Sequence, residues 1–327
     1  MTAMTAEITR LYDPIRPDLT EVERVFDDEL STEAPFIDDL CETIRSYRGK
    51  MLRPALLLLV GKALGPPTRS HHILAAVVEM VHMATLVHDD VLDGAELRRK
   101  RPTIARLSGN VGAVLFGDYL ISHAFHLCSS LNSQHASRRI GAATNVVCEG
   151  ELLQNYRRGD ARLDESSYLK MIRMKTGSLT GVAAELGAWA SDADSAVIQA
   201  MQNFGQAAGV AFQIVDDVLD VVGTGDQMGK TLGRDAALGK LTLPAICALS
   251  RPDSDTAQFI RSELANPQNL DAERWAAVLS ESGGIEYALS VAREFVADAL
   301  RHLSVLPNGE ARQSLTALTE FILARRN

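Results

Sequence analysis

The stretch Met80–Asp93, MVHMATLVHDDVLD, joins an apolar helical pattern to three carboxylates at its end. A second stretch, Val210–Asp220 (VAFQIVDDVLD), ends on the same pentapeptide word for word. In each copy the first and last aspartates are four residues apart, so they lie on one face of a helix. These stacked pairs are Asp89 with Asp93 and Asp216 with Asp220. Both stretches therefore predict long helices with buried apolar faces and carboxylates gathered near one end.

Ionised carboxylates in apolar helical sequence are costly unless a cation meets them. Oxygen ligands suit hard cations such as Mg²⁺, which leaves coordination positions open for water and phosphate oxygens. A single DDxxD is more often a solvated surface patch, but duplication after two apolar runs favours a metal site. We expect two carboxylate walls that face one another and bind a cluster of Mg²⁺ ions, for which Mn²⁺ could substitute, together with a diphosphate.

The composition is that of a soluble chain rich in helix. Of 327 residues 46% are hydrophobic but only 5% aromatic, and strand-like alternation is rare, so helix is favoured throughout. A formal net charge of −9 argues against a nucleic-acid partner. The four scattered cysteines predict free buried thiols in a reducing compartment. Because neither a secretory signal nor a run near ~20 apolar residues is evident, we expect a cytoplasmic protein without a transmembrane segment.

Helical periodicity recurs from end to end, and no linker or composition shift divides the chain. We expect one all-α domain over residues 1–327, a multi-helix bundle, with residues 1–19 forming a loosely ordered N-terminal extension. The predicted helices span 20–47, 54–63, 70–98, 111–130, 137–157, 165–191, 195–223, 241–250, 255–264, 271–283, 285–304 and 309–325.

Basic residues flank the first pentapeptide. The run Arg98–Arg101, RRKR, is predicted to close the helix before Pro102. It could simply complement the helix dipole on a solvated face, or its guanidinium forks could bind phosphate. Upstream, RGKMLRP places Lys50 and Arg53 around a loop-to-helix junction, where backbone N–H groups and cations can meet one anion.

Similar features accompany the second pentapeptide. Gly229-Lys230 and Gly239-Lys240 suit a lid that closes over phosphate, although an ordinary surface loop has the same composition. Lys175-Thr176-Gly177 interrupts a helical pattern with a cation, a hydroxyl and an expected kink. His82 and Gln213, seven and three residues before the two pentapeptides, could be substrate ligands or ordinary core residues.

Taken together, these motifs resemble the trans-isoprenyl (polyprenyl) diphosphate synthase family, and its long-chain members in particular. LVHDDVLDGAELRRKRPT resembles the first Asp-rich region of that family, and FQIVDDVLD…GK…GRD…GKLTLP the second. RGKMLRP is similar to the GKxLRP segment, MKTGSL to the KT motif, and GDYL and CEGELLQ to further helices. The similarity runs from about residue 20 to the C-terminal FILARR, and five ordered motifs make it specific.

The resemblance implies an all-α isoprenoid synthase fold around a deep central cavity, usually in a homodimer. It implies that isopentenyl diphosphate condenses with an allylic diphosphate (geranyl, farnesyl or geranylgeranyl). The implied metal ligands are Asp89, Asp93, Asp216, Asp217 and Asp220. The implied allylic diphosphate ligands are Arg98, Lys175, Thr176, Gln213, Lys230 and Lys240. The implied isopentenyl diphosphate ligands are Lys50, Arg53, His82 and Arg99. The resemblance counts Asp89, Asp93, Asp216, Lys175 and Arg98 as catalytic.

Two positions depart from the family pattern. Where the family often has RRGKP, this chain has Lys100 and Arg101 before the proline, and Arg48 stands where glycine is common. Both changes are expected to add positive charge near phosphate, so we expect no loss of function.

Product length should depend on the helix that precedes Asp89, along which the growing tail is expected to run. One helical turn rises ~5.4 Å, so side chains four to nine residues before Asp89 lie one and two turns deeper. They are Ala84, Thr85, Val81 and Met80. Short-chain members of the family place an aromatic ring there, so we expect a product beyond C15, in the C30–C50 class, with C20 (geranylgeranyl) as the alternative. The floor could instead be set elsewhere, at Phe125 or Leu120.

Two rival functions share this fold. Terpene cyclases usually replace the second Asp-rich motif with an Asn/Ser/Glu type, and non-catalytic partner subunits lose the Asp-rich motifs. Both motifs are complete here, which favours the synthase. A long product would be handed to a membrane.

Overall fold

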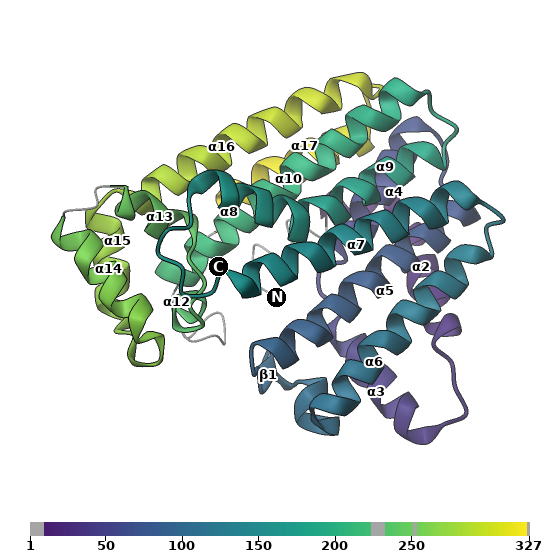
Figure 1. The fold of residues 1–327 in the computed structure, drawn as a ribbon. Helices are drawn as coiled ribbons and strands as arrows, with labels where there is room; N and C mark the ends of the chain where they lie inside the picture. The colour runs from purple at the N-terminus through teal and green to yellow at the C-terminus, as the bar shows by residue number, and fades with distance from the viewer. Residues whose placement is uncertain (1–9, 224–232, 251–253, 326–327) are drawn as a thin grey trace. The chain divides into compact units, whose positions relative to one another are not determined.

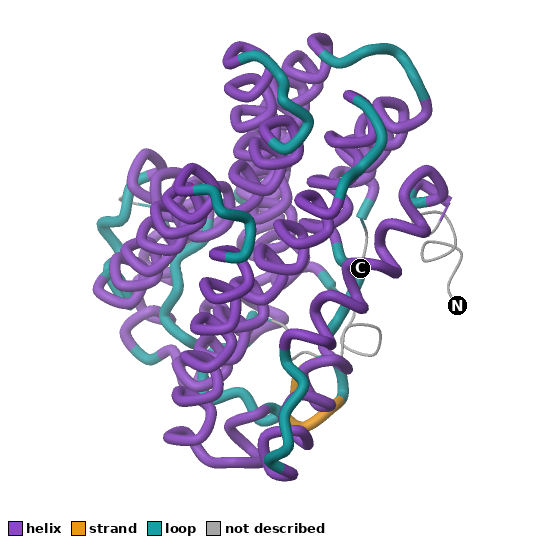
Figure 2. Tube along the Cα trace, turned by 90° about the vertical axis from the view of Figure 1, so that its right-hand side faces the viewer, coloured by secondary structure: helices purple, strands orange, loops and turns teal. Residues whose placement is uncertain are grey.

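The computed structural model describes residues 10–223, 233–250 and 254–325. Within these ranges the regular structure is helical except for a hairpin of two-residue strands, β1 (Leu97–Arg98) and β2 (Arg101–Pro102) (Figures 1 and 2). The chain divides into two compact units, each of which we describe by itself. The expectation of a single domain, and that of a deep central cavity, stay predictions.

The first unit comprises residues 1–144, 179–205 and 302–318. Its elements are η1 (Asp13–Ile15), α2 (Arg16–Glu29), α3 (Pro35–Tyr47), α4 (Leu52–Leu64), α5 (Arg69–Leu92), β1, β2, α6 (Ile104–Ser129), most of α9 (Ser178–Trp189) and η4 (Leu303–Val305). The central helix is α5, against which α2, α4 and α6 pack (Figure 1). Thr68 starts α5 with a capping box, and the apolar side chains that follow are buried, which explains why this stretch is a long core helix.

The second unit comprises residues 145–178, 206–301 and 319–327. Its elements are α8 (Glu165–Ile172), the π-helical η2 (Arg173–Gly177), α12 (Arg234–Ala237), α13 (Leu243–Leu249), α14 (Asp255–Ala265), η3 (Pro267–Asn269), α15 (Ala272–Glu281) and α16 (Gly284–His302). Helix α13 packs against α8, α14 and α15. Helices α7 (Gln134–Tyr156), α10 (Ser195–Val222) and α17 (Glu310–Ala324) are divided between the two units, and α9 and α16 each have one end residue in the other unit.

The N-terminal expectations need correction. Residues 10–19 are not loosely ordered, because η1 and the start of α2 occupy them and Ile15 is fully buried; residues 1–9 lie outside the described residues. The predicted helix 20–47 is two helices, since Pro35 begins α3 after a break at 30–34. The predicted helix 70–98 ends at Leu92, and the basic run that follows forms the β1–β2 hairpin instead.

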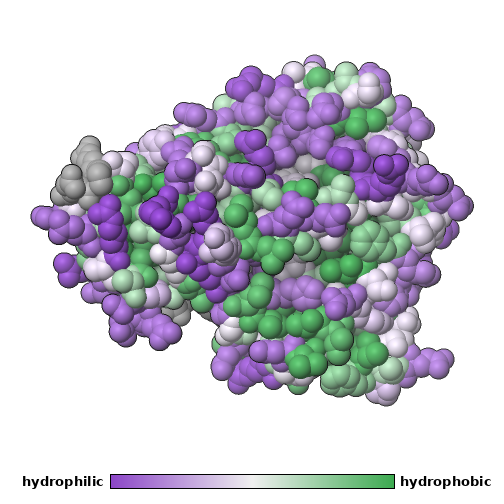
Figure 3. Space-filling model, in the orientation of Figure 1, coloured by the Kyte–Doolittle hydropathy of each residue, from purple (hydrophilic) through white to green (hydrophobic). Residues whose placement is uncertain are grey.

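In the part of the chain that the structure describes, two helices, α5 and α6, are long and apolar enough to cross a membrane by length and composition, although the sequence predicted no such segment. The apolar window of α5 is 72% buried within the chain, as expected of a core helix, whereas that of α6 is only 39% buried. Exposed apolar side chains on α6 are Leu107, Val111, Val114, Leu115 and Phe125. Apolar side chains gather over this helix in Figure 3.

None of the four cysteines forms a disulfide. Cys41 and Cys128 are buried, but Cys148 is exposed on α7, so the expectation of buried thiols is wrong for that residue.

Candidate active site

The first pentapeptide forms the last turn of α5, in the first unit. Asp89 and Asp93 are half-buried, while Asp90 is only 2% exposed. Both carboxylate oxygens of Asp90 accept from Arg98, whose Nε lies 3.0 Å from Oδ1 and 2.9 Å from Oδ2 and whose Nη2 lies 2.8 Å from Oδ1. The middle aspartate therefore turns inward to hold an arginine, and the outer pair remains accessible on the helix.

The β1–β2 hairpin fixes where the basic run points. Its two-residue turn, Arg99-Lys100, has φ of +50° and +65°, the left-handed conformation that such turns require. The Arg99 Nη1 donates to the carbonyl oxygen of Tyr47 at 2.6 Å. A Cβ at Gly49 would collide with the Arg99 guanidinium, so the glycine of RGKMLRP is needed for this close approach.

The residues predicted to bind isopentenyl diphosphate occur around this hairpin. Burial, together with the positive charges of Arg53, Arg98 and Arg99, lowers the pKa of His82 well below its ordinary value, so this histidine is neutral. The Nε of Arg53 is buried and finds no hydrogen-bond partner among the described residues. Lys50 is exposed at the junction that leads into α4. The structure thus brings a neutral histidine, a half-buried arginine and a hairpin arginine close enough for their charges to act on one another.

Two neighbours of this region change the sequence-based interpretation. The Arg48 guanidinium is held by an ion pair with Asp27, which also pairs with Arg45, and lies 4.4 Å from the centre of the Phe26 ring. Glu79, which the sequence analysis missed, is 2% exposed on α5. Burial raises its pKa to about 7, although the charges of Arg53 and two other arginines oppose that rise. A glutamate within the apolar run ILAAVVEMV was the available signal.

The second pentapeptide lies near the end of α10, in the second unit. Asp217 is 5% exposed, and its Oδ2 accepts from the Tyr168 hydroxyl at 2.6 Å while its Oδ1 accepts from the Gln213 Nε2 at 2.8 Å. Burial, followed by the charge of Asp235, raises its pKa well above the ordinary value. Asp220 is half-buried and its Oδ2 accepts the Asp235 N–H at 3.0 Å.

Lys175 and Thr176 lie in the π-helical turn η2, where the sequence predicted a kink. The turn is closed by the Ser178 N–H, which donates to the carbonyl of Arg173 five residues earlier. Thr176 Oγ1 donates to the Gln213 Oε1 at 2.7 Å, and Lys175 pairs with Glu151. A Cβ at Gly150 would lie only 2.9 Å from the Lys175 backbone nitrogen, so this glycine lets α7 approach the π turn closely.

Arg325, just beyond α17, is a further residue that the sequence analysis missed. Its Nη2 donates to the Asp216 Oδ1 at 3.2 Å, and its guanidinium carbon lies 4.1 Å from the centre of the Phe212 ring. Its Nη1 is buried without a hydrogen-bond partner among the described residues. Because this arginine is 109 positions from Asp216 in the chain, no local pattern could have paired them.

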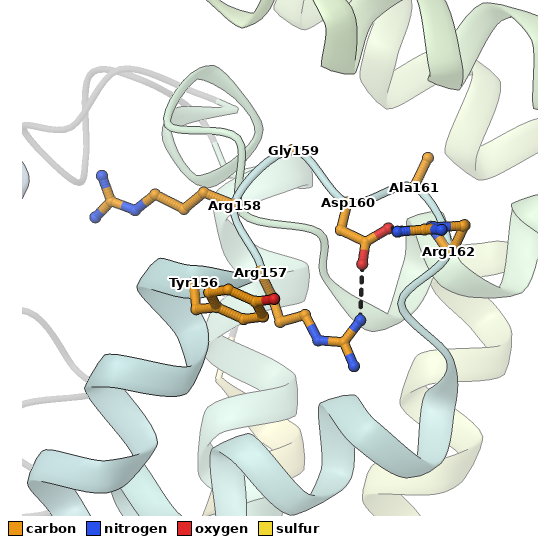
Figure 4. A pocket seen from close by; sticks show the side chains of 7 residues that line it. All are labelled: Tyr156, Arg157, Arg158, Gly159, Asp160, Ala161 and Arg162. Carbon is orange, nitrogen blue, oxygen red and sulfur yellow. Dashed lines mark hydrogen bonds and ion pairs between the residues drawn. The ribbon is translucent and has the colours of Figure 1, made fainter.

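The lysines of the predicted lid are only partly described. Lys230 lies outside the described residues. Lys240 follows Gly239, whose carbonyl accepts the Gly159 N–H at 2.8 Å. The loop around Gly159 lines an open cavity of about 640 Å³ that the sequence did not predict (Figure 4). In it Arg157 and Arg162 both bind Asp160, at 2.7 and 3.1 Å, and Arg158 points to the other side of the loop.

The residues proposed to set product length lie on α5. Ala84, Val81 and Met80 are fully buried, and the half-buried Thr85 donates its Oγ1 to the carbonyl of His82 at 2.7 Å. Of the alternative floor residues on α6, Leu120 is buried and Phe125 is 36% exposed. The open tunnel along α5 stays a prediction.

The carboxylate pairs fit a hard divalent cation. Each pentapeptide presents two half-buried carboxylates four residues apart on one helix face, and oxygen is the ligand that such cations prefer. Within the described ranges no three His, Cys, Asp or Glu side chains gather closely enough to hold a metal ion by themselves. Each pair would therefore need oxygens from water or from a bound diphosphate to complete the coordination.

The chain is similar to known proteins over nearly its whole length. A model of the family described as polyprenyl synthetase matches residues 34–281, which include both pentapeptides. The chain belongs to the polyprenyl synthetase family. Octaprenyl diphosphate synthase of Haemophilus influenzae is 34% identical over 320 residues, which cover 98% of this chain and 96% of that protein. Nonaprenyl diphosphate synthase of Mycobacterium tuberculosis is 34% identical over 317 residues, covering 95% and 93%.

A solved structure of the same family gives the fold. The polyprenyl synthase from Caulobacter crescentus, crystallised with calcium and isoprenyl diphosphate, has a TM-score of 0.93 and 33% identity over 98% of both chains. The predicted all-α isoprenoid synthase fold is thereby confirmed. The roles of individual residues are not tested by this likeness and stay predictions.

Proposed function

We propose that the chain is a divalent-metal-dependent trans-prenyltransferase that condenses an allylic diphosphate with isopentenyl diphosphate into a polyprenyl diphosphate of the C30–C50 class. The observation that carries the proposal is the duplicated pentapeptide, which presents a half-buried carboxylate pair beside cationic side chains in each unit. Membership of the polyprenyl synthetase family and relatives that are named octaprenyl and nonaprenyl diphosphate synthases support it.

The metal is proposed to be Mg²⁺, with Mn²⁺ as a substitute, held by the outer carboxylates of each pentapeptide. These are Asp89, Asp93, Asp216 and Asp220. When bound, the cations would supply Lewis-acid stabilisation of the departing diphosphate. Among the protein groups, the Arg98 guanidinium is positioned by its hydrogen bonds to Asp90 and would stabilise part of the negative charge of the diphosphate.

We assign one set of side chains to each of the two substrates. For the allylic diphosphate we assign Arg98, Lys175, Thr176, Gln213, Lys230 and Lys240. For isopentenyl diphosphate we assign Lys50, Arg53, His82 and Arg99. A neutral His82 can donate one ring N–H without adding charge, and the buried Arg53 Nε offers a donor that the described residues leave unused.

In the proposed reaction, the covalent bonds that break and form are those of the substrates. The allylic C–O bond breaks, the diphosphate leaves with the electron pair, and the double bond of isopentenyl diphosphate attacks the carbocation before a proton is lost. Water would quench the cation, and the buried apolar side chains of α5 next to the first pentapeptide suit its exclusion. Their small size at Ala84 is the feature that favours a long product.

We further propose a homodimer in the cytoplasm. The exposed apolar residues of α6, which include Val111 at 76% exposed and Leu115 at 63%, form a stripe at helical spacing. A second copy of the chain would remove this surface from water. Separately, we propose that the long apolar product passes to a membrane.

The test is an elongation assay. Purified protein is incubated with farnesyl and isopentenyl diphosphates and Mg²⁺, and the products are sized by chromatography. Products of C30–C50 support the proposal, and a main product of C20 would favour the shorter-chain alternative. Cyclised hydrocarbons, or no reaction with this or a geranyl primer, would overturn it in favour of a cyclase or a non-catalytic subunit.

A further inference from the structure

We infer that Tyr168 is a positioning residue that acts through Asp217, and that Asp217 orients the Gln213 amide toward the allylic diphosphate instead of binding metal. This inference rests on the proposed function, since it assumes that Gln213 and Thr176 meet that substrate. The sequence motifs assigned no role to Tyr168, and they implied only a metal-binding role for Asp217.

The first step is the environment of Asp217. Its side chain is 5% exposed and Tyr168 is 2% exposed, so their 2.6 Å hydrogen bond is shielded from water. The second carboxylate oxygen accepts from Gln213 at 2.8 Å. Each oxygen thus already serves a protein donor, and a cation would have to enter a space that is almost closed to solvent. The exposed fraction of the Asp216 side chain, in contrast, is 41%.

The second step is the direction of the Gln213 amide. Its Nε2 donates to Asp217, and its Oε1 accepts from the Thr176 hydroxyl at 2.7 Å. In this orientation Asp217 accepts from the amide nitrogen and Thr176 donates to the amide oxygen, so both partners hold the amide in place. One N–H of Gln213 then remains to donate to a phosphate oxygen. Without Tyr168, Asp217 would lose one of the two donors that hold its carboxylate in place.

An independent observation in the first unit has the same form. There the middle aspartate, Asp90, is 2% exposed, and both of its carboxylate oxygens accept hydrogen bonds from Arg98. We assigned Arg98 to the allylic diphosphate above. In both copies of the pentapeptide the outer aspartates are half-buried and the middle one is buried. Each copy of the pentapeptide therefore supplies two outer carboxylates that suit a cation and one buried carboxylate that holds a phosphate-binding side chain.

The experiment compares Tyr168→Phe with Tyr287→Phe. Tyr287 donates its hydroxyl to Glu165 at 2.8 Å in the same unit, so the control also removes one tyrosine–carboxylate bond. Tyr168→Phe should raise the KM for the allylic diphosphate about tenfold, the loss expected for one charge-assisted hydrogen bond, and leave the KM for isopentenyl diphosphate within about twofold. Binding of the slowly ionising analogue farnesyl thiodiphosphate, followed by calorimetry, should weaken by the same factor.

A second variant tests the metal half of the inference. Asp217→Asn should leave the number of Mn²⁺ ions bound, counted by electron paramagnetic resonance with the analogue present at saturation, equal to that of wild type. Loss of a bound ion, or a Tyr168→Phe variant whose substrate constants match those of Tyr287→Phe, would overturn the inference. Both variants are checked for the wild-type circular dichroism spectrum first. If wild type itself does not elongate, the proposed function has failed, which is a separate result.

Discussion

Replacing Glu79 by glutamine should make the protein more stable at neutral and alkaline pH. Glu79 is 2% exposed, and its pKa rises from an ordinary 4.5 to about 7 because burial disfavours the ionised form. Glutamine has nearly the same shape as the protonated acid and cannot ionise. The substitution therefore removes a group that the fold prefers to keep neutral.

The direction follows from where the proton is bound. Between pH 4.5 and about 7 the unfolded chain releases the proton while the folded chain retains it, so wild-type stability falls as the pH rises through this window. At ~1.4 kcal/mol per pH unit, the full loss is about 3 kcal/mol. Below pH 4.5 the two proteins should be equally dependent on pH, and above about 7 the glutamine variant should keep a constant advantage.

The assay is urea unfolding of wild type and Glu79→Gln at intervals from pH 4.5 to 8, with Glu286→Gln as the control. Glu286 is an exposed glutamate, so its loss should shift stability little at any pH. The prediction is a gap between wild type and Glu79→Gln that opens by about 3 kcal/mol across the window. Parallel curves, or a gap that opens toward acid, would refute the reasoning about burial.

Four further outcomes are expected. Asp89→Ala and Asp216→Ala should each lower turnover at least ~10²-fold by removing a carboxylate from a cation pair, and near-normal rates in both would remove the metal assignment. Arg325→Ala should lower the Mn²⁺ concentration that half-saturates the substrate-free protein, because Asp216 loses a competing cation; the charge-retaining Arg325→Lys should bind as wild type, and equal affinities for all three would argue against competition. Lys100→Gly should raise the free energy of unfolding by up to about 1 kcal/mol, because glycine adopts a φ of +65° without strain, and a lower melting temperature would contradict this. Ala84→Phe should shorten the main product without slowing the first condensation, as seen by chromatography, and an unchanged product would place the floor elsewhere.

The parts of the site that depend on spacing along one helix could be predicted from the sequence. Asp89 and Asp93 stack because four residues make about one turn, whatever surrounds the helix. Apolar periodicity likewise located α5 and α10, although it continued too far at Arg98. The pattern favoured helix there, while the chain forms a hairpin through two residues that need a left-handed backbone.

Other features depend on contacts between segments that are distant in the chain, which no local pattern contains. The Tyr168–Asp217 bond joins residues 49 apart, and the Arg325–Asp216 bond joins residues 109 apart. A motif can identify Asp217 as one member of an acidic set. Only the packing of other helices around it decides whether its oxygens serve a cation or a protein donor.

The π turn η2 changes the angle around the helix axis between the side chains that precede it and those that follow it. Tyr168 and Thr176 are eight residues apart, and in an uninterrupted α-helix, at ~100° per residue, they would point ~80° apart. The π turn absorbs one residue, so the pair behaves as if about seven residues apart, or two whole turns, and both side chains face α10. A one-residue deletion within Arg173–Gly177 should therefore rotate one of the two hydroxyls away from its partner while the rest of the helix stays regular. The extra residue in η2 therefore places the hydroxyls of Tyr168 and Thr176 on the same side of the helix, where they donate to Asp217 and Gln213.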